Sequence, residues 1–195
     1  GVITEIKNEG ETGDTGSAVY TTNGKFTLDG VIEYCYMRNA LFLNASQEEN
    51  AGIINGSVRY NTSTGSNGYT VVAQTSDLII NSTGVIEENQ AGISTVYAPS
   101  GANIDLYGTI QNNVGTQCGG IHMYSNWNGG RNITVDMYDG AKIINNSSSG
   151  GALNDRGGAV CSGGAGGTSG STECIFTMHG GEISGNESSN GAVFV

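Results

Sequence analysis

The stretch GGEISGNESSNGAVFV (Gly180–Val195) contains a pattern that recurs along the chain. An apolar pair or triplet is followed by an Asn, a variable interval, and then a small pair of residues before Ala or Ile. Clear copies read GTIQNNVGTQCGGIHM (Gly108–Met123), AKIINNSSSGGALNDRGGAV (Ala141–Val160) and GVIEENQAGIST (Gly84–Thr95), and weaker ones lie at Ala51–Ile54 and Gly16–Tyr20. The sequence is therefore a series of repeats.

The spacing of these copies predicts a solenoid. One glycine of each small pair serves as a marker, and the intervals between markers are 36, 40, 28, 38 and 33 residues, an average of 35. Repeats of this length stack one unit on the next and bury a continuous core between them. The markers are Gly16, Gly52, Gly92, Gly120, Gly158 and Gly191.

Inside each repeat the apolar residues alternate with a period of two, which is typical of strands. Ile133, Val135 and Met137 are one example, and Phe26 and Leu28 are another. The repeats align in three strand columns. We therefore expect a single all-β domain over residues 1–195, a parallel β-helix with three short strands per coil and about six coils, right-handed by the crossover rule.

The aligned columns predict which residues face inward. One column consists of isoleucines, which should be buried inside the coil, and Leu106, Met137 and Met178 should be buried in an adjacent column. Asparagines stand between the isoleucines and the small pairs, where a short amide tolerates left-handed backbone and can bond to its stacked equivalent. The isoleucine column is Ile32, Ile86, Ile110, Ile143 and Ile183; the asparagines are Asn89, Asn113, Asn146 and Asn186; and the residues after the small pairs are Ile53, Ile93, Ile121, Val160 and Val193.

Variation is concentrated between these columns. The largest variable segments are predicted to be loops at Asn39–Asn50, Asn61–Tyr69 and Cys161–Cys174. The 33 glycines and single proline favour many tight turns between short strands. The expected molecule is thus a regular interior with irregular surface excursions.

Charge and hydropathy exclude several functions. The net charge of −11, from 7 basic and 18 acidic residues, argues against binding nucleic acid or an anionic membrane, because a basic patch supplies that affinity. No apolar run approaches the roughly 18 residues of a membrane-spanning helix. The chain begins with Gly and lacks a basic-then-apolar signal segment, so we expect a mature secreted chain or a section of a larger cell-surface protein.

Short motifs carry a resemblance to a known group of proteins. The chain resembles the parallel β-helix repeats of bacterial and archaeal surface proteins, including the polymorphic outer-membrane proteins with their GGA[ILV] and FxxN motifs. This resemblance implies adhesion, surface coating or polysaccharide processing. The first motif appears as GGAV at Gly157–Val160 and more loosely as GGIH at Gly119–His122 and NGAV at Asn190–Val193; the second appears as IxxN at Ile86–Asn89, Ile110–Asn113, Ile143–Asn146 and Ile183–Asn186.

The four cysteines suit disulfides in an oxidising compartment. Cys161 and Cys174 flank a glycine-rich excursion, so we predict that they are bonded to each other. For Cys35 and Cys118, buried free thiols and links between molecules are both open. A zinc site formed by Cys118, His122, Cys161 and Cys174 is an alternative. Because the sequence contains no CxxC pair, which is usual in zinc sites, we predict that the protein binds no metal and no cofactor.

Eight asparagines lie in N-x-S/T contexts, which fits an extracellular chain and makes them candidate glycosylation sites. They are Asn44, Asn55, Asn61, Asn81, Asn132, Asn145, Asn146 and Asn186.

One group of side chains is the best candidate for catalysis. Asp105 and Asp136 should stack in one outward column, and His179 should face out beside Tyr107 and Tyr138. Glycoside-cleaving enzymes need paired carboxylates. Without a neighbouring base or sugar-binding arginine, we interpret the group as stacked surface side chains and predict no catalytic residues; a polysaccharide lyase or hydrolase is the minor alternative.

A different group is the best candidate for ligand contact. Tyr124, Trp127 and Arg131 lie close together around the loop SNWNGGRN, and an exposed aromatic beside an arginine can stack on a sugar. Local loop packing is the alternative.

The resulting functional prediction is a non-enzymatic, extracellular structural protein that associates with itself into a sheath, filament or surface layer. Both ends of the chain read as apolar strands, and unpaired strand edges invite pairing with another copy. The alternative is an adhesin or glycan-binding module of a larger cell-surface protein, with surface glycans or envelope proteins as partners. The predicted pairing edges are Val2, Ile3 and Ile6 at one end and Val193, Phe194 and Val195 at the other.

Overall fold

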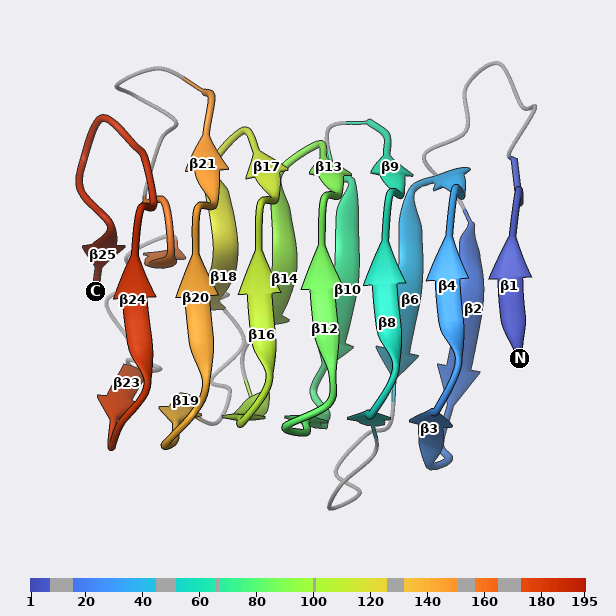
Figure 1. The fold of residues 1–195 in the computed structure, drawn as a ribbon, viewed down its shortest axis with the longest axis horizontal. Helices are drawn as coiled ribbons and strands as arrows, with labels where there is room; N and C mark the ends of the chain where they lie inside the picture. Colours follow the sequence, from blue (N-terminus) through green and yellow to red (C-terminus); the bar gives the residue numbers. More distant parts are fainter. Residues whose placement is uncertain are drawn as a thin grey trace.

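The structure is a computed structural model that describes residues 1–7, 16–44, 52–65, 67–99, 101–125, 132–150, 157–164 and 173–195. Within these ranges every regular element is a β-strand, and the strands stack in parallel sheets along one axis (Figure 1). The all-β class and the parallel stacking predicted from the repeats are confirmed.

Four sheets can be distinguished. The first contains β1 (Val2–Thr4), β4 (Val31–Glu33), β8 (Ser57–Arg59), β12 (Val85–Glu87), β16 (Thr109–Gln111), β20 (Lys142–Ile144) and β24 (Glu182–Ser184). The second contains β2 (Ser17–Thr22), β6 (Asn39–Asn44), β10 (Tyr69–Gln74), β14 (Ser94–Pro99), β18 (Cys118–Ser125), β22 (Val160–Gly164) and β25 (Val193–Phe194).

The other two sheets are shorter. The third contains β3 (Phe26–Leu28), β7 (Gly52–Ile54), β11 (Asp77–Ile80), β15 (Asn103–Leu106), β19 (Ile133–Met137) and β23 (Cys174–Met178). The fourth contains the two-residue strands β5 (Tyr36–Met37), β9 (Thr62–Ser63), β13 (Gln90–Ala91), β17 (Val114–Gly115) and β21 (Ser147–Ser148), which the prediction of three strands per coil did not include.

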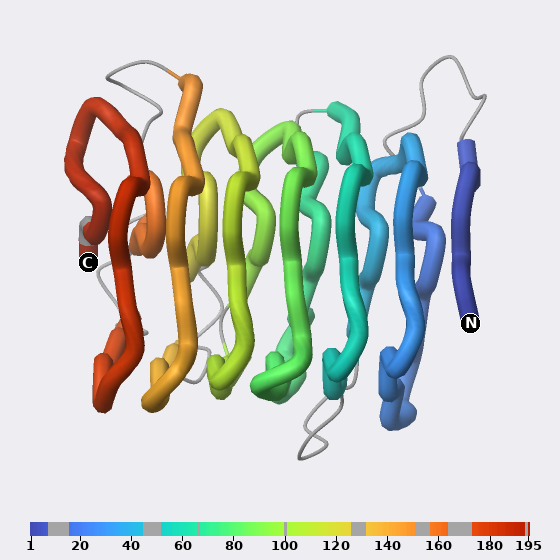
Figure 2. Tube along the Cα trace, viewed as in Figure 1, coloured from blue at the N-terminus to red at the C-terminus, as the bar shows by residue number. Residues whose placement is uncertain are grey.

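The chain passes through the third, first, fourth and second sheets in that order, and then repeats the path one step further along the axis. Figure 2 shows successive turns side by side, with the two termini at opposite ends of the long axis. Residues at the same place in successive turns are therefore direct neighbours. Apolar, amide or aromatic side chains that occupy the same position in successive turns are thus stacked about 4.8 Å apart, the spacing of neighbouring strands.

The interior follows the predicted columns through most of the molecule. Ile110 and Ile143 are fully buried in register with each other, and Leu106 and Met137 are fully buried in the next sheet. Ile183 is only partly buried, and the prediction for Met178 is wrong because its side chain is 47% exposed. Met178 pairs with Met137, but β23 is the last strand of its sheet, so no further described strand covers it.

Two register predictions were wrong. Ile93 precedes β14, and the residue that lies beside Ile121 is Val96. Ile53 does not lie beside Ile121 in the second sheet; it belongs to β7 in the third sheet, between Thr27 and Ile79. The preceding residue, Gly52, is a glycine for a different reason from the other marker glycines: a Cβ at this position would lie 2.3 Å from the Leu43 side chain.

In the second sheet, β6 occupies the position that the sequence predicts for Ile53, and Leu41 lies there between Val19 and Val71. The segment Asn39–Asn44 was predicted to be loop, yet it is a strand with Leu41 and Leu43 fully buried. Parts of the other two predicted loops are strands as well, namely β9 and β22.

A ladder of buried asparagines joins the first sheet to the fourth. In each step the side-chain oxygen of one asparagine accepts both the backbone N–H and the side-chain N–H of the asparagine one turn earlier. Asn89, for example, donates these two bonds to Asn113 at 3.0 and 2.9 Å, and its amide also donates to the carbonyl of Val58 at 2.9 Å. The ladder consists of Asn61, Asn89, Asn113, Asn146 and Asn186, and the Cys35 N–H donates to Asn61 at its beginning.

The predicted amide stacking is thus confirmed, with one correction. The left-handed backbone lies one residue earlier in each turn, for example at Glu88 with φ 53° and Asn112 with φ 55°. That residue turns the chain so that the next side chain points into the protein, where its amide replaces the hydrogen bonds lost at the corner.

Replacing Asn113 with Ala should destabilise the protein by about 3 kcal/mol or more, because it leaves the buried N–H groups of Asn89 and the carbonyl of Ile86 without their partner. The free energy of unfolding from chemical denaturation measures the loss. Asn103→Ala is the matched control, since Asn103 is exposed on β15, and it should cost no more than about 0.5 kcal/mol. Equal effects of the two changes would contradict a central role for the ladder.

Candidate functional site

The outer face of the second sheet carries a column of rings. In β2, β6, β10, β14 and β18 the residue that follows a core position points outward, and the parallel register brings these residues side by side. The inward neighbours are Val19, Leu41, Val71, Val96 and Ile121; the outward residues, one per strand, are Tyr20, Phe42, Val72, Tyr97 and His122.

The column is interrupted at one place. Tyr20 and Phe42 stack with ring centroids 5.2 Å apart, and Tyr97 and His122 meet edge to face at 5.7 Å. Between Phe42 and Tyr97 the outward residue is Val72, which has no ring. A side chain of this size leaves a gap in a stack whose other members are rings.

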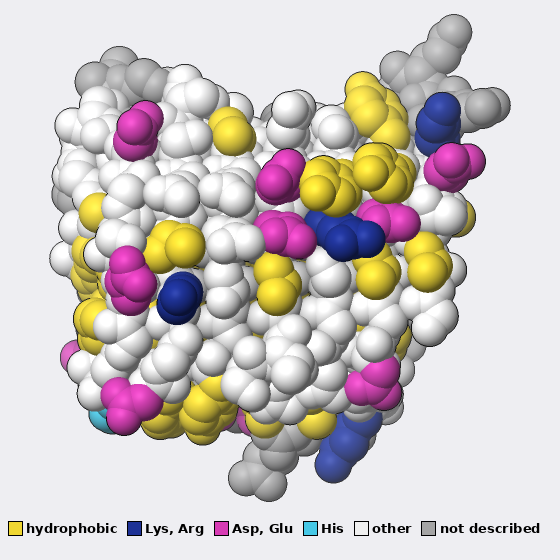
Figure 3. Space-filling model, in the orientation of Figure 1, with side chains coloured by type: hydrophobic (Ala, Val, Ile, Leu, Met, Phe, Trp, Pro, Cys, Tyr) yellow, Lys and Arg dark blue, Asp and Glu magenta, His cyan; other side chains and the backbone are white. Residues whose placement is uncertain are grey.

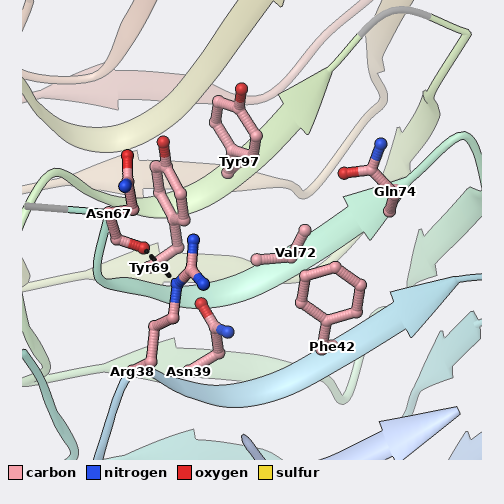
Figure 4. A pocket seen from close by; sticks show the side chains of 8 residues that line it. All are labelled: Arg38, Asn39, Phe42, Asn67, Tyr69, Val72, Gln74 and Tyr97. Atoms are coloured by element: carbon pink, nitrogen blue, oxygen red, sulfur yellow. Dashed lines mark hydrogen bonds between the residues drawn. The ribbon is translucent and has the colours of Figure 1, made fainter. Parts of the chain in front are cut away.

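A hollow of about 340 Å³ lies at this gap (Figure 4). Phe42 and Tyr97 border it on two sides and Val72 lies between them, while Tyr69 stands beside Tyr97 with ring centroids 4.0 Å apart. The hollow is within the size range of small-molecule sites, about 300–1,000 Å³. Its polar lining consists of Arg38, Asn39, Asn67 and Gln74.

Two further hollows adjoin the central one. One of about 380 Å³ shares Arg38, Asn39 and Phe42 with it and extends to Tyr20. The other, of about 290 Å³, shares Asn67, Tyr69 and Tyr97 and extends past His122 to Tyr124. Together the three form a groove that crosses β2, β6, β10, β14 and β18, and we call it the ring-side groove.

The wall opposite the rings is held by hydrogen bonds. The Arg38 Nε donates to the carbonyl of Asn67 at 3.3 Å, and the backbone N–H of Tyr69 donates to the carbonyl of Arg38 at 3.1 Å. The buried Asn39 amide is satisfied on all sides when its oxygen faces the Ser17 hydroxyl at 3.2 Å and its nitrogen donates to the carbonyls of Arg38 and Tyr69. These hydrogen bonds fix Arg38 and Asn39 in place.

Burial sets the charge of the groove's phenols. It raises the pKa of Tyr97 well above the ordinary value, and the neighbouring Tyr69 adds to the effect. Burial also raises the pKa of Tyr69. Both hydroxyls keep their protons at neutral pH. Among the described residues that line the ring-side groove, Arg38 is a cation and none is an aspartate or glutamate.

Only one of the three residues predicted for ligand contact can be placed. Tyr124 lines the end of the ring-side groove, and Trp127 and Arg131 lie outside the described residues. The sequence reasoning missed Tyr20, Phe42, Tyr69 and Tyr97. The available signal was an aromatic residue directly after an inward apolar one in successive repeats, as at Tyr20, Phe42 and Tyr97, and the wrong register of Gly52 hid it.

The cysteines are thiols in the structure. Cys35, Cys118 and Cys161 are buried, Cys174 is partly buried, and the predicted Cys161–Cys174 disulfide is not formed. Burial raises the pKa of the Cys35 and Cys174 thiols. Within the described ranges no group of three or more His, Cys, Asp and Glu side chains is arranged to hold a metal ion.

The candidate glycosylation sites differ in accessibility. Asn61 and Asn146 are buried members of the asparagine ladder, so a glycan on either amide is incompatible with this fold, and Asn186 also belongs to the ladder. Asn145 and Asn132 are exposed. Asn44, Asn55 and Asn81 are half-buried on the outer surface.

The candidate catalytic group forms a surface stack on the third sheet, as interpreted from the sequence. Tyr107 and Tyr138 stack at 4.4 Å, and Tyr138 and His179 stack at 5.0 Å. The His179 Nε2 lies 2.9 Å from an Asp136 oxygen, and the Tyr138 hydroxyl donates to Asp105 at 3.3 Å. Burial raises the pKa of Asp105, while Tyr138 opposes the shift. Each carboxylate thus binds a ring of the next turn.

The outer face of the first sheet differs from the groove. Figure 3 shows basic, acidic and apolar side chains next to one another on this face. Arg59 pairs with Glu33 at 2.9 Å and lies over the Tyr60 ring at 5.6 Å, and Tyr60 stacks with Tyr34. The cation here is already neutralised by its neighbour.

The predicted pairing edges lie on different sheets. Val2 is 60% exposed on β1 of the first sheet, with Ile3 half-buried beside it and Ile6 exposed just after it. Val193 is 42% exposed on β25 of the second sheet, followed by Phe194, which pairs with Cys161, and the exposed Val195.

Comparisons with known proteins add no identification: no family model matches the chain, and neither a curated protein nor a solved structure matches it. No helix in the described part of the chain has the length and apolarity needed to cross a bilayer.

Replacing Tyr97 with Phe should change how stability depends on alkaline pH. The unfolded tyrosine ionises near pH 10, whereas the raised pKa keeps the folded one protonated. The stabilisation is complete below about pH 10 and is lost as the pH rises, because only the unfolded state releases the proton. The free energy of unfolding should fall less steeply between about pH 9.5 and 11 in the variant. Identical slopes would show that Tyr97 ionises alike in both states.

Proposed function

We propose that this chain is a non-enzymatic, extracellular glycan-binding β-helix module, and that the ring-side groove is its binding site. In this proposal the stacked sheets form one right-handed solenoid of about six coils, each with three main strands and a short fourth. The observation that carries the proposal is the gap between Phe42 and Tyr97 over Val72.

The gap suits one sugar ring. Phe42 and Tyr97 are two strands apart, so the spacing of parallel strands places their rings about 9.6 Å from each other. A pyranose ring over Val72 would lie between the Phe42 ring on one side and the stacked Tyr69–Tyr97 pair on the other. Its hydroxyls would meet Arg38 and Gln74 at the edges of the hollow.

The rest of the groove suits a linear chain of sugars. Apolar ring edges on one wall and fixed polar groups on the other match the mixed surface of a glycan. The groove crosses five strands, a length of about 19 Å at the usual spacing, which is room for about four sugar residues along the axis.

Binding without catalysis is favoured by where the carboxylates lie. The part of the groove lining that the structure describes includes no aspartate or glutamate, and Asp105 and Asp136 belong to the third sheet, where each contacts a ring of the next turn. Glycoside cleavage needs a carboxylate pair at the bound sugar.

Filling the gap tests the proposal. Val72→Phe should fill the hollow and lower glycan affinity at least tenfold; because Val72 is 1% exposed, the larger side chain should also lower the melting temperature, so far-UV circular dichroism checks that the variant is folded. Val72→Ala keeps the gap open and is the matched control, with binding retained. A glycan array followed by calorimetric titration of the bound members measures the affinities. Unchanged binding by Val72→Phe would exclude this site.

Self-association is a second candidate, favoured by the exposed apolar residues at both ends of the sheets. Extending the observed register would place β1 of one copy beside β24 of another and β2 beside β25, so the pairing of Val2–Ile6 with Val193–Val195 expected from the sequence joins strands of different sheets. A flanking segment of a longer polypeptide could fill the same edges. The asparagine ladder would be interrupted at such a junction, because Ile6 precedes Cys35 in its column.

Sedimentation velocity distinguishes the two candidates. A filament-forming chain should sediment as a concentration-dependent polymer, and Val193→Pro, which removes an edge N–H, should abolish it. A monomer at all concentrations would remove self-association and leave glycan binding untouched.

A further inference from the structure

We infer that the sugar held at the gap is an acidic one, and that Arg38 binds its carboxylate; this inference rests on the proposed glycan-binding function. Arg38 lines both the central hollow and the hollow toward Tyr20. It therefore lies at the centre of the site and not at its margin.

The guanidinium of Arg38 is oriented but not neutralised. Its Nε–H is bound to the Asn67 carbonyl, which leaves the two terminal nitrogens for a ligand, and Figure 4 shows them directed into the hollow between Asn39 and Tyr69. No ion pair joins Arg38 to a carboxylate in the described ranges. A half-buried cation that the protein does not neutralise is a ready partner for an anion.

The contrast with Arg59 shows that neutralisation is available to this protein. Arg59 lies on β8, and the turn before it supplies Glu33 at 2.9 Å. Arg38 lies at the corner between β5 and β6, and the neighbouring turns supply Asn67 and Ser17 there instead of carboxylates. The chain carries a net charge of −11, yet the described residues that line the groove around Arg38 include no acidic side chain.

The chemistry of the site favours a single carboxylate over a more highly charged group. One arginine presents two parallel N–H donors that match one carboxylate, whereas phosphate sites usually gather several cations or a helix N-terminus. The remaining lining groups are neutral amides and phenols, which suit hydroxyls. A glycan with occasional uronate or sialate residues fits this arrangement, and a densely charged polyanion would meet the negative charge of the rest of the protein.

Paired ligands test the inference. Linear tetrasaccharides that carry one glucuronate, galacturonate or N-acetylneuraminate residue are titrated into the protein, each as the free acid and as its methyl ester. At least one free acid should bind about tenfold or more tightly than its ester, the strength of a charge-assisted hydrogen bond, and added salt should weaken the binding of the acid alone.

Two arginine variants complete the test. Arg38→Gln should abolish the difference between acid and ester, whatever its effect on the affinity for the ester, and Arg59→Gln, which removes the same charge outside the groove, should preserve the difference. Far-UV circular dichroism confirms that both variants are folded. Equal binding of acid and ester by the original chain would overturn this inference and leave the proposed function intact, whereas no binding of either form would overturn both.

Discussion

The buried asparagine ladder is the interaction on which the rest of the structure depends. A corner between two sheets leaves backbone N–H and C=O groups without strand partners, and burying them unsatisfied would be costly. In this chain one amide per turn satisfies the turn before and the turn after at once, as Asn113 does between Ile86 and Asn146. The corner therefore has the same geometry in every turn, and the sheets on either side stay in register.

That fixed register separates the requirements of folding from those of the surface. The inward positions must remain apolar and the corner must supply an amide, but the outward position of each strand is restricted only by its two neighbours in the column. Each outer column can accordingly take its own chemistry. The column from Tyr107 to His179 is aromatic with carboxylates attached, whereas the column from Tyr20 to His122 is aromatic with one gap.

The inward positions could be predicted from the sequence, whereas the outward positions could not, because only the inward positions follow the requirements of folding. The isoleucines and asparagines could be placed because their columns obey one rule in every turn, so Ile110, Ile143 and Asn113 were assigned correctly. Gly52 was misplaced because a glycine before an apolar pair has two causes here, a small-pair corner and a clash with Leu43. The groove depends on which side chains meet across strands some 25 residues apart, and a shift of one register hides it.

The hollow arises because one strand of the ring column carries Val72 in place of a ring, and its walls are therefore ordered before a ligand binds. The walls at Val72 are rings already held by their own stacking partners, Tyr20 behind Phe42 and Tyr69 beside Tyr97, so they need not rearrange when a ligand enters. Ligand binding would then lose little free energy to the ordering of side chains. The strand spacing sets the width of the gap, which would accept a single ring. In the proposed site the two requirements fall on different residues of the same hollow: the rings beside Val72 would select a sugar by its shape, and Arg38 would select it by its charge.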